Sequence, residues 1–226
     1  TGDDPDLVIL DCSVVLDLDQ GGTGTSGREQ YESGHIPSAS FADLTTDLAD
    51  PDSELAYALP SPEAFCAAMG RLGVGDQSTV VLYDRSTSFW AARVWWMLRW
   101  VGFDRAALLD GGLHAWTALG NPLSMVEPQP APGRLTPSVR PELVADRTEV
   151  LEAIDDDAVC IVDTFTPEHY RGEWSRYTRA GHIPSAVNLS AASMYAEDGR
   201  LLTQEQLDAA YERWQALEAL AQPNES

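Results

Sequence analysis

The sequence contains two copies of one pattern, and this repeat limits the folds open to the chain more than any other feature. The first copy begins with LVILDCS at 7–13 and the second with VCIVDTF at 159–165, each an apolar run that ends in aspartate and a small residue. Both runs are followed by the segment GHIPSA, which contains His35 in the first copy and His182 in the second. The number of residues between the two histidines is about the length of one domain. A separation of this size is too long for a solenoid repeat. We therefore predict two similar domains in tandem.

Both copies favour strands and helices in alternation. Each apolar run predicts a buried parallel strand that ends in a polar loop. The segments 59–74 and 201–217 have helical periodicity, and each opens on a serine or threonine that can cap a helix. The first copy adds an apolar run at 79–83, an expected helix over 88–101, and a further strand and helix within 106–123. This alternation predicts an α/β fold of tandem domains, each a parallel sheet flanked by helices.

A proline-rich segment separates the two copies. Residues 121–143 read NPLSMVEPQPAPGRLTPSVRPEL and have few periodic apolar positions, which is typical of a linker. We predict a first domain over 1–122, a linker over 123–143 and a second domain over 144–226.

The charge of the chain argues against some partners. It has 14 basic and 36 acidic residues, a formal net charge of -22. Nucleic acids and anionic membranes are bound by clustered lysine and arginine, so we expect neither as a partner. The three cysteines and four histidines show no metal-binding spacing, and we expect no metal and no cofactor. An odd number of cysteines and the lack of a basic-then-apolar leader lead us to expect a cytoplasmic protein.

One glycine-rich stretch matches a dinucleotide-binding fingerprint only in spacing. Gly22, Gly24 and Gly27 form a G-x-G-x-x-G pattern. An acidic DLDQ precedes it, and only REQYES separates it from GHIP, which leaves no room for a crossover helix. We interpret the stretch as a flexible loop.

Three motifs follow one another along the first copy. They are YESGHIPSASF at 31–41, FWAARVWWMLRWVGFD at 89–104 and LLDGGLHAWTALGNPL at 108–123. In order and duplication they resemble the two-domain rhodaneses, the thiosulfate and 3-mercaptopyruvate sulfurtransferases. The first is similar to the family's N-terminal signature, with Ser38 where glycine is more usual. The resemblance covers about residues 7–214, almost the whole chain.

The resemblance implies sulfur transfer. In this family a cysteine thiolate takes the outer sulfur of a small anionic donor, thiosulfate or 3-mercaptopyruvate, and forms a persulfide. The sulfur then passes to a thiophilic acceptor such as cyanide or a thiol. The resemblance places this cysteine in the second domain, while the first domain is a non-catalytic copy that helps to wall the pocket.

Asp84 occupies the nucleophile position of the first repeat. It lies between the apolar run 79–83 and the helix expected over 88–101, where a strand delivers a loop to the edge of the sheet. A carboxylate there can accept loop N–H groups and cap the helix, but it cannot carry a sulfane sulfur. We therefore predict a structural role for Asp84 and name no catalytic residue. By resemblance, Phe89 and Trp90 face the pocket, although a plain role in the helix core is an equally good interpretation.

The second copy departs from the family pattern. The spacing from Pro37 to Asp84, counted from Pro184, ends a few positions beyond residue 226, and nothing after Pro184 resembles a strand that delivers a cysteine. We therefore expect the second domain to be incomplete in this sequence. All three cysteines, Cys12, Cys66 and Cys160, lie in or beside an expected strand or helix, which is typical of buried structural thiols.

The family's anion-binding arginine falls at His169, and Arg171 is the nearest substitute. Phe165 replaces another arginine that is common in this loop. We take His169, Arg171, Phe89 and Trp90 as the candidate donor-binding residues. Two hypotheses stay open: a sulfurtransferase whose catalytic segment lies outside this sequence, and a non-catalytic rhodanese-like module that binds an anion or a protein.

Overall fold

The structure is a computed structural model, which describes residues 4, 6–16, 24–175 and 177–221. The chain divides into two compact units, Thr1–Val144 and Ala145–Ser226. We call them unit 1 and unit 2, and each is described by itself. No helix within the described ranges is both long and apolar enough to cross a bilayer.

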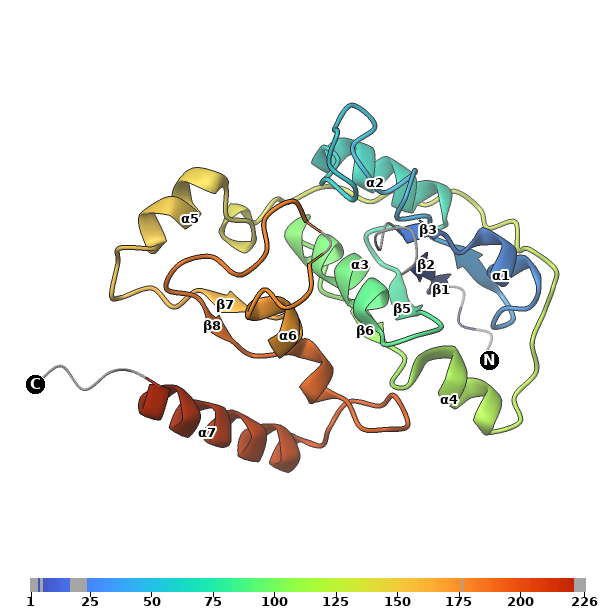
Figure 1. Ribbon diagram of the computed structural model, residues 1–226. Coiled ribbons are helices and arrows are strands. Elements are labelled where there is room, and N and C mark those ends of the chain that lie inside the picture. Colours follow the sequence, from blue (N-terminus) through green and yellow to red (C-terminus); the bar gives the residue numbers. More distant parts are fainter. Residues whose placement is uncertain (1–3, 5, 17–23, 176, 222–226) are drawn as a thin grey trace, which may run out of the picture. The chain divides into compact units, whose positions relative to one another are not determined.

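Unit 1 is built on a four-stranded sheet in the order β4-β1-β5-β6, and every neighbouring pair is parallel. Figure 1 labels β1, β5 and β6 of this sheet. Its strands are β1 (Leu7–Asp11), β4 (Ala39–Phe41), β5 (Thr79–Tyr83) and β6 (Ala106–Leu108). Its helices are α1 (Arg28–Glu32), α2 (Pro62–Arg71), α3 (Phe89–Trp100), α4 (Gly112–Ala118) and the short η1 (Pro141–Leu143). The predicted α/β fold with a parallel sheet is confirmed.

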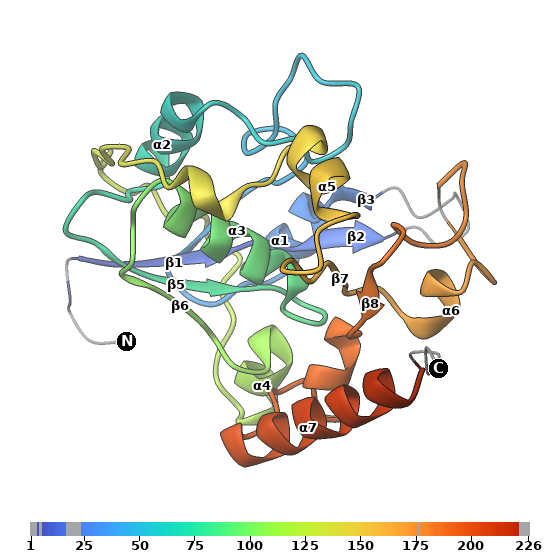
Figure 2. The ribbon, with the colours of Figure 1, turned by 90° about the vertical axis from the view of Figure 1, so that its left-hand side faces the viewer.

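Helices cover both faces of this sheet (Figure 2). Side chains alternate along a strand, so Val8 and Leu10 of β1 point to one face while Ile9 points to the other. The first face packs against α2 and α3 in the larger core, and the second packs against α4 and the GHIP turn in a smaller one. The sheet is therefore buried on both sides, and ligands reach it from the edges where the strands end.

The helix starts follow the expected caps. Ser61 accepts a hydrogen bond from the Ala64 N–H at 3.2 Å and so begins α2, and Glu63 lies in the first turn. The segment 88–101, expected to be helical, contains α3. At its start the Ser88 backbone is left-handed, with φ 61°, and the Ser88 side chain makes no capping bond. Another residue must therefore satisfy the first N–H groups of α3.

The glycine-rich stretch is not a loop throughout. Gly24–Ser26 form β3, which pairs antiparallel with β2 (Val14–Leu16). A side chain on Gly24 would meet Val14 at 2.6 Å, so this position needs a glycine for close packing rather than for flexibility. Gly22 lies outside the described residues.

The proline-rich segment belongs to unit 1 and packs against the rest of it. The Ser124 N–H donates to the His35 carbonyl and the His35 N–H donates back, both at 2.8 Å. Further along, the Ser138 N–H donates to the Val101 carbonyl at 2.8 Å, and Leu135 is buried in the core. Apart from the short η1 at its end, the segment is thus held by hydrogen bonds to the rest of unit 1.

Unit 2 is smaller and contains one parallel pair of strands. The strands are β7 (Val162–Asp163) and β8 (Val187–Asn188). The helices are α5 (Arg147–Ala153), α6 (Pro167–Tyr170), the short η2 (Ala191–Met194) and α7 (Gln204–Ala221). The Thr203 hydroxyl accepts from the Gln206 N–H at 3.3 Å, which caps α7 as the sequence predicts. Of the described residues in this unit only His169 and Ala186 are buried.

Candidate functional site: an anion cradle at the sheet edge

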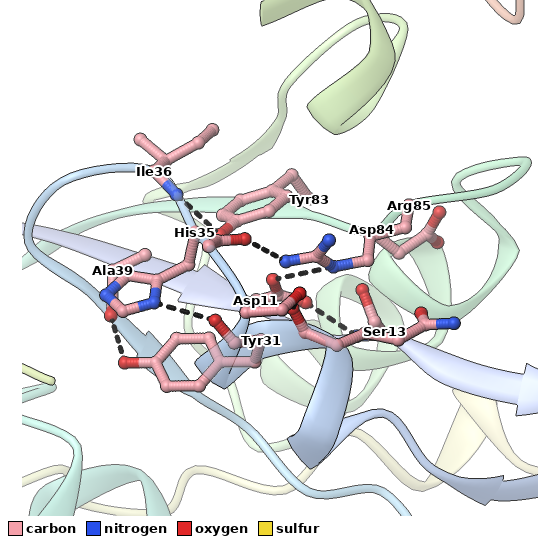
Figure 3. A network of polar contacts seen from close by, with 12 residues as sticks. Asp11, Ser13, Tyr31, His35, Ile36, Ala39, Tyr83, Asp84 and Arg85 are labelled. Carbon is pink, nitrogen blue, oxygen red and sulfur yellow. Dashed lines mark hydrogen bonds and ion pairs between the residues drawn. The ribbon is translucent and has the colours of Figure 1, made fainter. Parts of the chain in front are cut away.

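Asp84 lies directly after β5, in the loop that leads into α3 (Figure 3). Its carboxylate is 1% exposed and accepts four backbone N–H groups. One oxygen accepts from Ser86 at 2.9 Å and Ser88 at 3.0 Å, and the other accepts from Trp90 and Ala91, both at 3.1 Å. Four converging N–H groups at the start of a helix form a binding site for one negative charge. In unit 1 the protein's own aspartate fills this cradle.

The Asp84 side chain also replaces the missing cap of α3. Trp90 and Ala91 are the second and third residues of the helix, whose N–H groups have no partner inside it. A capping side chain normally bonds to these two positions from the residue just before the helix. Here the carboxylate reaches them from five residues before the first helical residue, so Asp84 provides the capping contacts that the Ser88 side chain does not make.

A glycine fixes the other side of the loop. The Asp84 carbonyl accepts a hydrogen bond from the Leu113 N–H at 3.1 Å, at the start of α4. A side chain on Gly112 would lie 2.4 Å from that carbonyl oxygen, and the Gly112 φ of +53° is also one that glycine favours. The DGG motif therefore holds α4 against the cradle.

Arg85 ties the cradle to two neighbouring segments. Its guanidinium lies 3.7 Å from the Asp11 carboxylate, at the end of β1, and also donates to the Gly34 carbonyl of the GHIP turn (Figure 3). The Asp11 side chain is fully buried and accepts the Ser13 N–H at 3.0 Å. Burial raises the pKa of the Asp11 carboxyl above its usual value, although Ser13 and Arg85 act in the opposite direction. Sequence reasoning missed this network, since no local spacing connects Asp11 with Arg85.

A tyrosine and histidine pair holds the GHIP turn in both units. In unit 1 the His35 ring stacks on Tyr31 at 3.9 Å, and its Nδ1 lies 2.9 Å from the Tyr31 carbonyl. In unit 2 the His182 ring stacks on Tyr170 at 3.6 Å, with Nδ1 2.7 Å from the Tyr170 carbonyl. Each tyrosine hydroxyl donates to an alanine carbonyl at 2.7 Å. The two units therefore share the ring stacking, the Nδ1 contact and the tyrosine hydrogen bond, and both histidines contact the backbone of their turn.

The backbone of the turn shows why glycine is the more usual residue at the position of Ser38. Ser38 has φ 70°, and its counterpart Ser185 has φ 63°, both in the left-handed region. Glycine adopts this conformation without strain, whereas other residues do so at a cost of about 1 kcal/mol. The two copies share this strained position.

The two candidate residues of α3 lie in different surroundings. Trp90 packs against the larger core, and its ring lies 4.9 Å from the Tyr57 ring. Phe89, the first residue of the helix, is 39% exposed. Phe89 is thus accessible from solvent, while Trp90 is partly buried.

His169 lies within a cluster of aromatic rings in unit 2. The Phe165 ring stacks on it at 4.3 Å, and the rings of Trp174 and Tyr177 meet it edge to face at 5.6 and 5.9 Å. The imidazole is 3% exposed, and neither nitrogen has a hydrogen-bond partner within the described residues. In unit 2 the stacked tyrosine and histidine are 12 positions apart in the sequence, whereas in unit 1 they are 4 apart. Trp174 and Tyr177 lie in this longer segment of unit 2.

Arg171 does not join this cluster. Its guanidinium donates to both carboxylate oxygens of Glu173, at 2.7 and 3.2 Å, and also lies 3.7 Å from Glu168. The positive charge of Arg171 is therefore paired with these two carboxylates at the surface. The structure thus buries His169 and exposes Arg171.

The cysteines lie in three different surroundings. Cys12 is fully buried after β1, where burial and the nearby carboxylates Asp11 and Asp84 raise the pKa of the thiol well above its usual range. Burial also raises the pKa of Cys66 to about 11. Cys160 is exposed, so the expectation that it is buried is wrong. The reason is that β7 begins only at Val162, two residues later, and pairs along one side with β8.

The fold and the site together define a tandem-repeat α/β protein that builds an anion cradle at the carboxyl edge of its first sheet. The rhodanese-like domain family matches residues 3–119. The 3-mercaptopyruvate sulfurtransferase of Escherichia coli K12 is 33% identical over 212 residues, covering 92% of this chain and 74% of that protein. The thiosulfate sulfurtransferase of Bos taurus is 31% identical, covering 88% of this chain and 69% of that protein.

A solved structure agrees with these matches. The crystal structure of SseA from Escherichia coli, described as showing the rhodanese fold of 3-mercaptopyruvate sulfurtransferases, superposes with a TM-score of 0.82 at 33% identity. The superposition covers 93% of this chain and 78% of SseA. This chain belongs to the rhodanese family.

Proposed function

We propose that this protein moves a sulfane sulfur from a small anionic donor to a thiophilic acceptor through a cysteine persulfide. The observation that carries the proposal is the ring of backbone N–H groups around the Asp84 carboxylate. The same loop with a cysteine at its tip would favour a thiolate and a persulfide anion. Membership of the rhodanese family and the relatives named as sulfurtransferases support the same reaction.

The reaction balances as two displacements at sulfur. A thiolate attacks the outer sulfur of thiosulfate, the S–S bond of the donor breaks, and sulfite leaves with the electron pair. With 3-mercaptopyruvate the C–S bond breaks instead, and the enolate of pyruvate leaves and takes up a proton. Cyanide or a thiolate then attacks the outer sulfur of the persulfide and releases the thiolate of the protein.

We assign the persulfide to none of the three cysteines described above. Cys12 and Cys66 are buried with raised pKa values, so they are rarely ionised at neutral pH. Cys160 lies before the amino end of β7, whereas the loop equivalent to the Asp84 loop would follow the carboxyl end of a strand. The proposed thiol instead occupies the position equivalent to Asp84 in a second loop of the same kind. The three thiols are free, which fits a reducing compartment, and we propose the cytoplasm.

Four side chains are proposed to bind the donor. His169 has two buried nitrogens without a partner in the described residues, and a hydrogen bond to an anionic donor would satisfy one of them. Arg171 would contribute charge after release from Glu173. Phe89 offers exposed apolar surface, and Trp90 supports it from the core.

One observation favours the second hypothesis, a non-catalytic module that binds an anion or a protein. The cradle of unit 1 is already filled by Asp84, and neither buried cysteine can act as a nucleophile there. This alternative predicts a protein without any thiol that accepts sulfur.

A turnover assay decides between the two. The purified natural protein is incubated with cyanide and either thiosulfate or 3-mercaptopyruvate, and thiocyanate is measured. We expect thiocyanate with at least one donor, and the Cys12→Ser variant should retain the rate once its folding has been verified. His169→Ala should raise KM for the donor more than it lowers kcat, while Gln30→Ala, at the exposed counterpart in unit 1, should change neither. No thiocyanate from either donor would leave the binding module as the function.

A further inference from the structure

A cleft of about 410 Å³ lies on unit 1, between α2 and the proline-rich segment 132–137. The wall formed by α2 consists of one stripe of its surface. The residues of the stripe repeat at the spacing of a single helix face: Glu63, Cys66, Ala67, Gly70 and Arg71. Across the cleft, Pro132, Leu135 and Pro137 form an apolar wall.

Close backbone contacts fix the floor of this cleft. The Gly133 N–H donates to the Gly70 carbonyl at 2.9 Å, and a side chain on Gly70 would lie 2.7 Å from the Gly133 carbonyl oxygen. A side chain on Gly133 would lie 2.4 Å from the Val74 backbone. Leu135 anchors the segment in the core at 7% exposure. The two walls therefore keep their separation without a ligand.

Two arginines at one end of the cleft lack an acidic partner. All 14 basic residues of the chain are arginines, in a protein with 36 acidic ones. Several described arginines form ion pairs with carboxylates, as Arg28 does with Glu127 and Arg140 does with Asp104. Arg71 and Arg134 both line the cleft, and neither guanidinium group has a hydrogen bond or ion pair to a described residue.

The carboxylate of the cleft lies at the other end. Glu63 is in the first turn of α2 and Arg71 in the last, a separation of about 12 Å along the helix axis at 1.5 Å per residue. The Gly133 contact with Gly70 places Arg134 at the Arg71 end. The side chains that line the cleft are therefore positive at one end, apolar in the middle and negative at the other end.

We propose that this cleft binds a small, elongated carboxylate with an apolar body, such as an aryl-alkanoic or medium-chain acid. The carboxylate lies between the guanidinium groups of Arg71 and Arg134, which suit planar oxyanions. The apolar body covers Ala67 and Leu135 and ends before Glu63. A volume of this size matches ligands of that kind.

The proposed site is separate from the cradle. Arg71 ends α2 a few residues before β5 begins at Thr79, so this end of the cleft lies toward the amino ends of the strands. Asp84 follows the carboxyl end of β5. Cys66 contributes neutral apolar surface to the wall formed by α2, since burial keeps its thiol protonated. The inference is therefore independent of the sulfur-transfer proposal.

The test is a titration of the full chain with 4-phenylbutyrate, followed by the backbone amide signals of Gly70 and Gly133 in two-dimensional NMR spectra. We expect saturable shifts of both signals. Arg71→Ala and Arg134→Ala should each weaken binding at least about fivefold, because each removes one charge contact. Glu63→Gln should bind as tightly as the unaltered chain or more tightly. Arg105→Ala, an exposed arginine that bonds to Thr79 in the same unit, is the matched control.

Three results would overturn the proposal. They are an absence of saturable shifts at Gly70 and Gly133, equal binding of the uncharged 4-phenylbutyramide, and arginine variants that bind like the control. An unchanged spectrum elsewhere in the variants verifies that they are folded, which is expected because both arginines are exposed.

Discussion

Replacing Asp84 by alanine should destabilise unit 1 severely. The substitution removes the acceptor of four backbone N–H groups, and Ser88 and Ala91 are themselves buried. Each buried donor left without a partner costs about 1–3 kcal/mol, and loss of a helix cap costs about 0.5–2 kcal/mol. Because these terms overlap, we expect a loss of about 3–5 kcal/mol. This is a large part of the roughly 5–15 kcal/mol that stabilises a whole domain.

Asparagine at this position should lose less, about 2 kcal/mol, since one amide oxygen can still accept hydrogen bonds. Its NH2 group would face the N–H groups of Trp90 and Ala91, which the second carboxylate oxygen now satisfies. Urea unfolding followed by tryptophan fluorescence reports on α3, which contains four tryptophans. Asp47→Asn, on an exposed aspartate of the same unit, serves as the control and should stay within about 0.5 kcal/mol.

The order of stability among these variants tests whether the Asp84 hydrogen bonds hold the loop. Alanine must be less stable than asparagine, and asparagine less stable than the control. If Asp84→Ala unfolds at the same urea concentration as the control variant, then the four hydrogen bonds do not hold the loop, and the description of the cradle is wrong.

A cysteine at position 84 tests whether the N–H groups of the cradle stabilise a negative charge. In Asp84→Cys the new thiol faces the N–H groups that now surround the carboxylate. We expect these groups to lower the pKa of the new thiol below the usual value of about 8.5, as helix N-termini do elsewhere. Thiolate absorbance at 240 nm as a function of pH measures it, with Cys12→Ser in the background. A raised pKa would show that burial outweighs the N–H groups.

Three further predictions concern other parts of the chain. Cys160 should react rapidly with a thiol reagent in the folded protein, whereas Cys12 and Cys66 should react only after unfolding, and mass spectrometry of labelled peptides distinguishes them. The raised pKa of Asp11 stabilises the folded state below the ordinary carboxyl value and loses that contribution as pH rises through the raised value. Thermal unfolding of Asp11→Asn should therefore depend less on pH across this window than that of the unaltered chain, and an identical dependence would contradict the assignment. Ser38→Gly should stabilise unit 1 by up to about 1 kcal/mol in urea, because glycine relieves the left-handed strain, and a destabilised variant would argue against that strain.

The parts of the fold that sequence patterns predict are those with local causes. The start of α2 follows from a capping serine, and its length follows from helical periodicity. The loop at Asp84 is predictable because a buried strand, a polar turn and a helix follow one another within a few residues. The GHIP turns are predictable as a repeat, and a tyrosine ring stacks on a histidine ring in both units.

The features that escaped prediction depend on residues far apart in the chain. Arg85 meets Asp11 only because β1 and β5 are neighbours in the sheet. The segment 123–143 lacks a periodic pattern, yet it is held by backbone hydrogen bonds to the rest of unit 1. The aromatic cluster around His169 includes residues inserted into the second copy. The first copy has no equivalent of these residues, so the repeat could not predict the cluster.

The measurement that tests the proposed sulfur transfer most directly is the intact mass of the natural protein after incubation with thiosulfate or 3-mercaptopyruvate. Sulfur transfer through a cysteine persulfide predicts a gain of about 32 Da, one sulfur atom, that cyanide reverses. Peptide mapping should place it on a cysteine other than Cys12, Cys66 and Cys160. No gain with either donor would contradict the proposed sulfur transfer, and a gain on one of these three cysteines would contradict the proposed location of the reacting thiol.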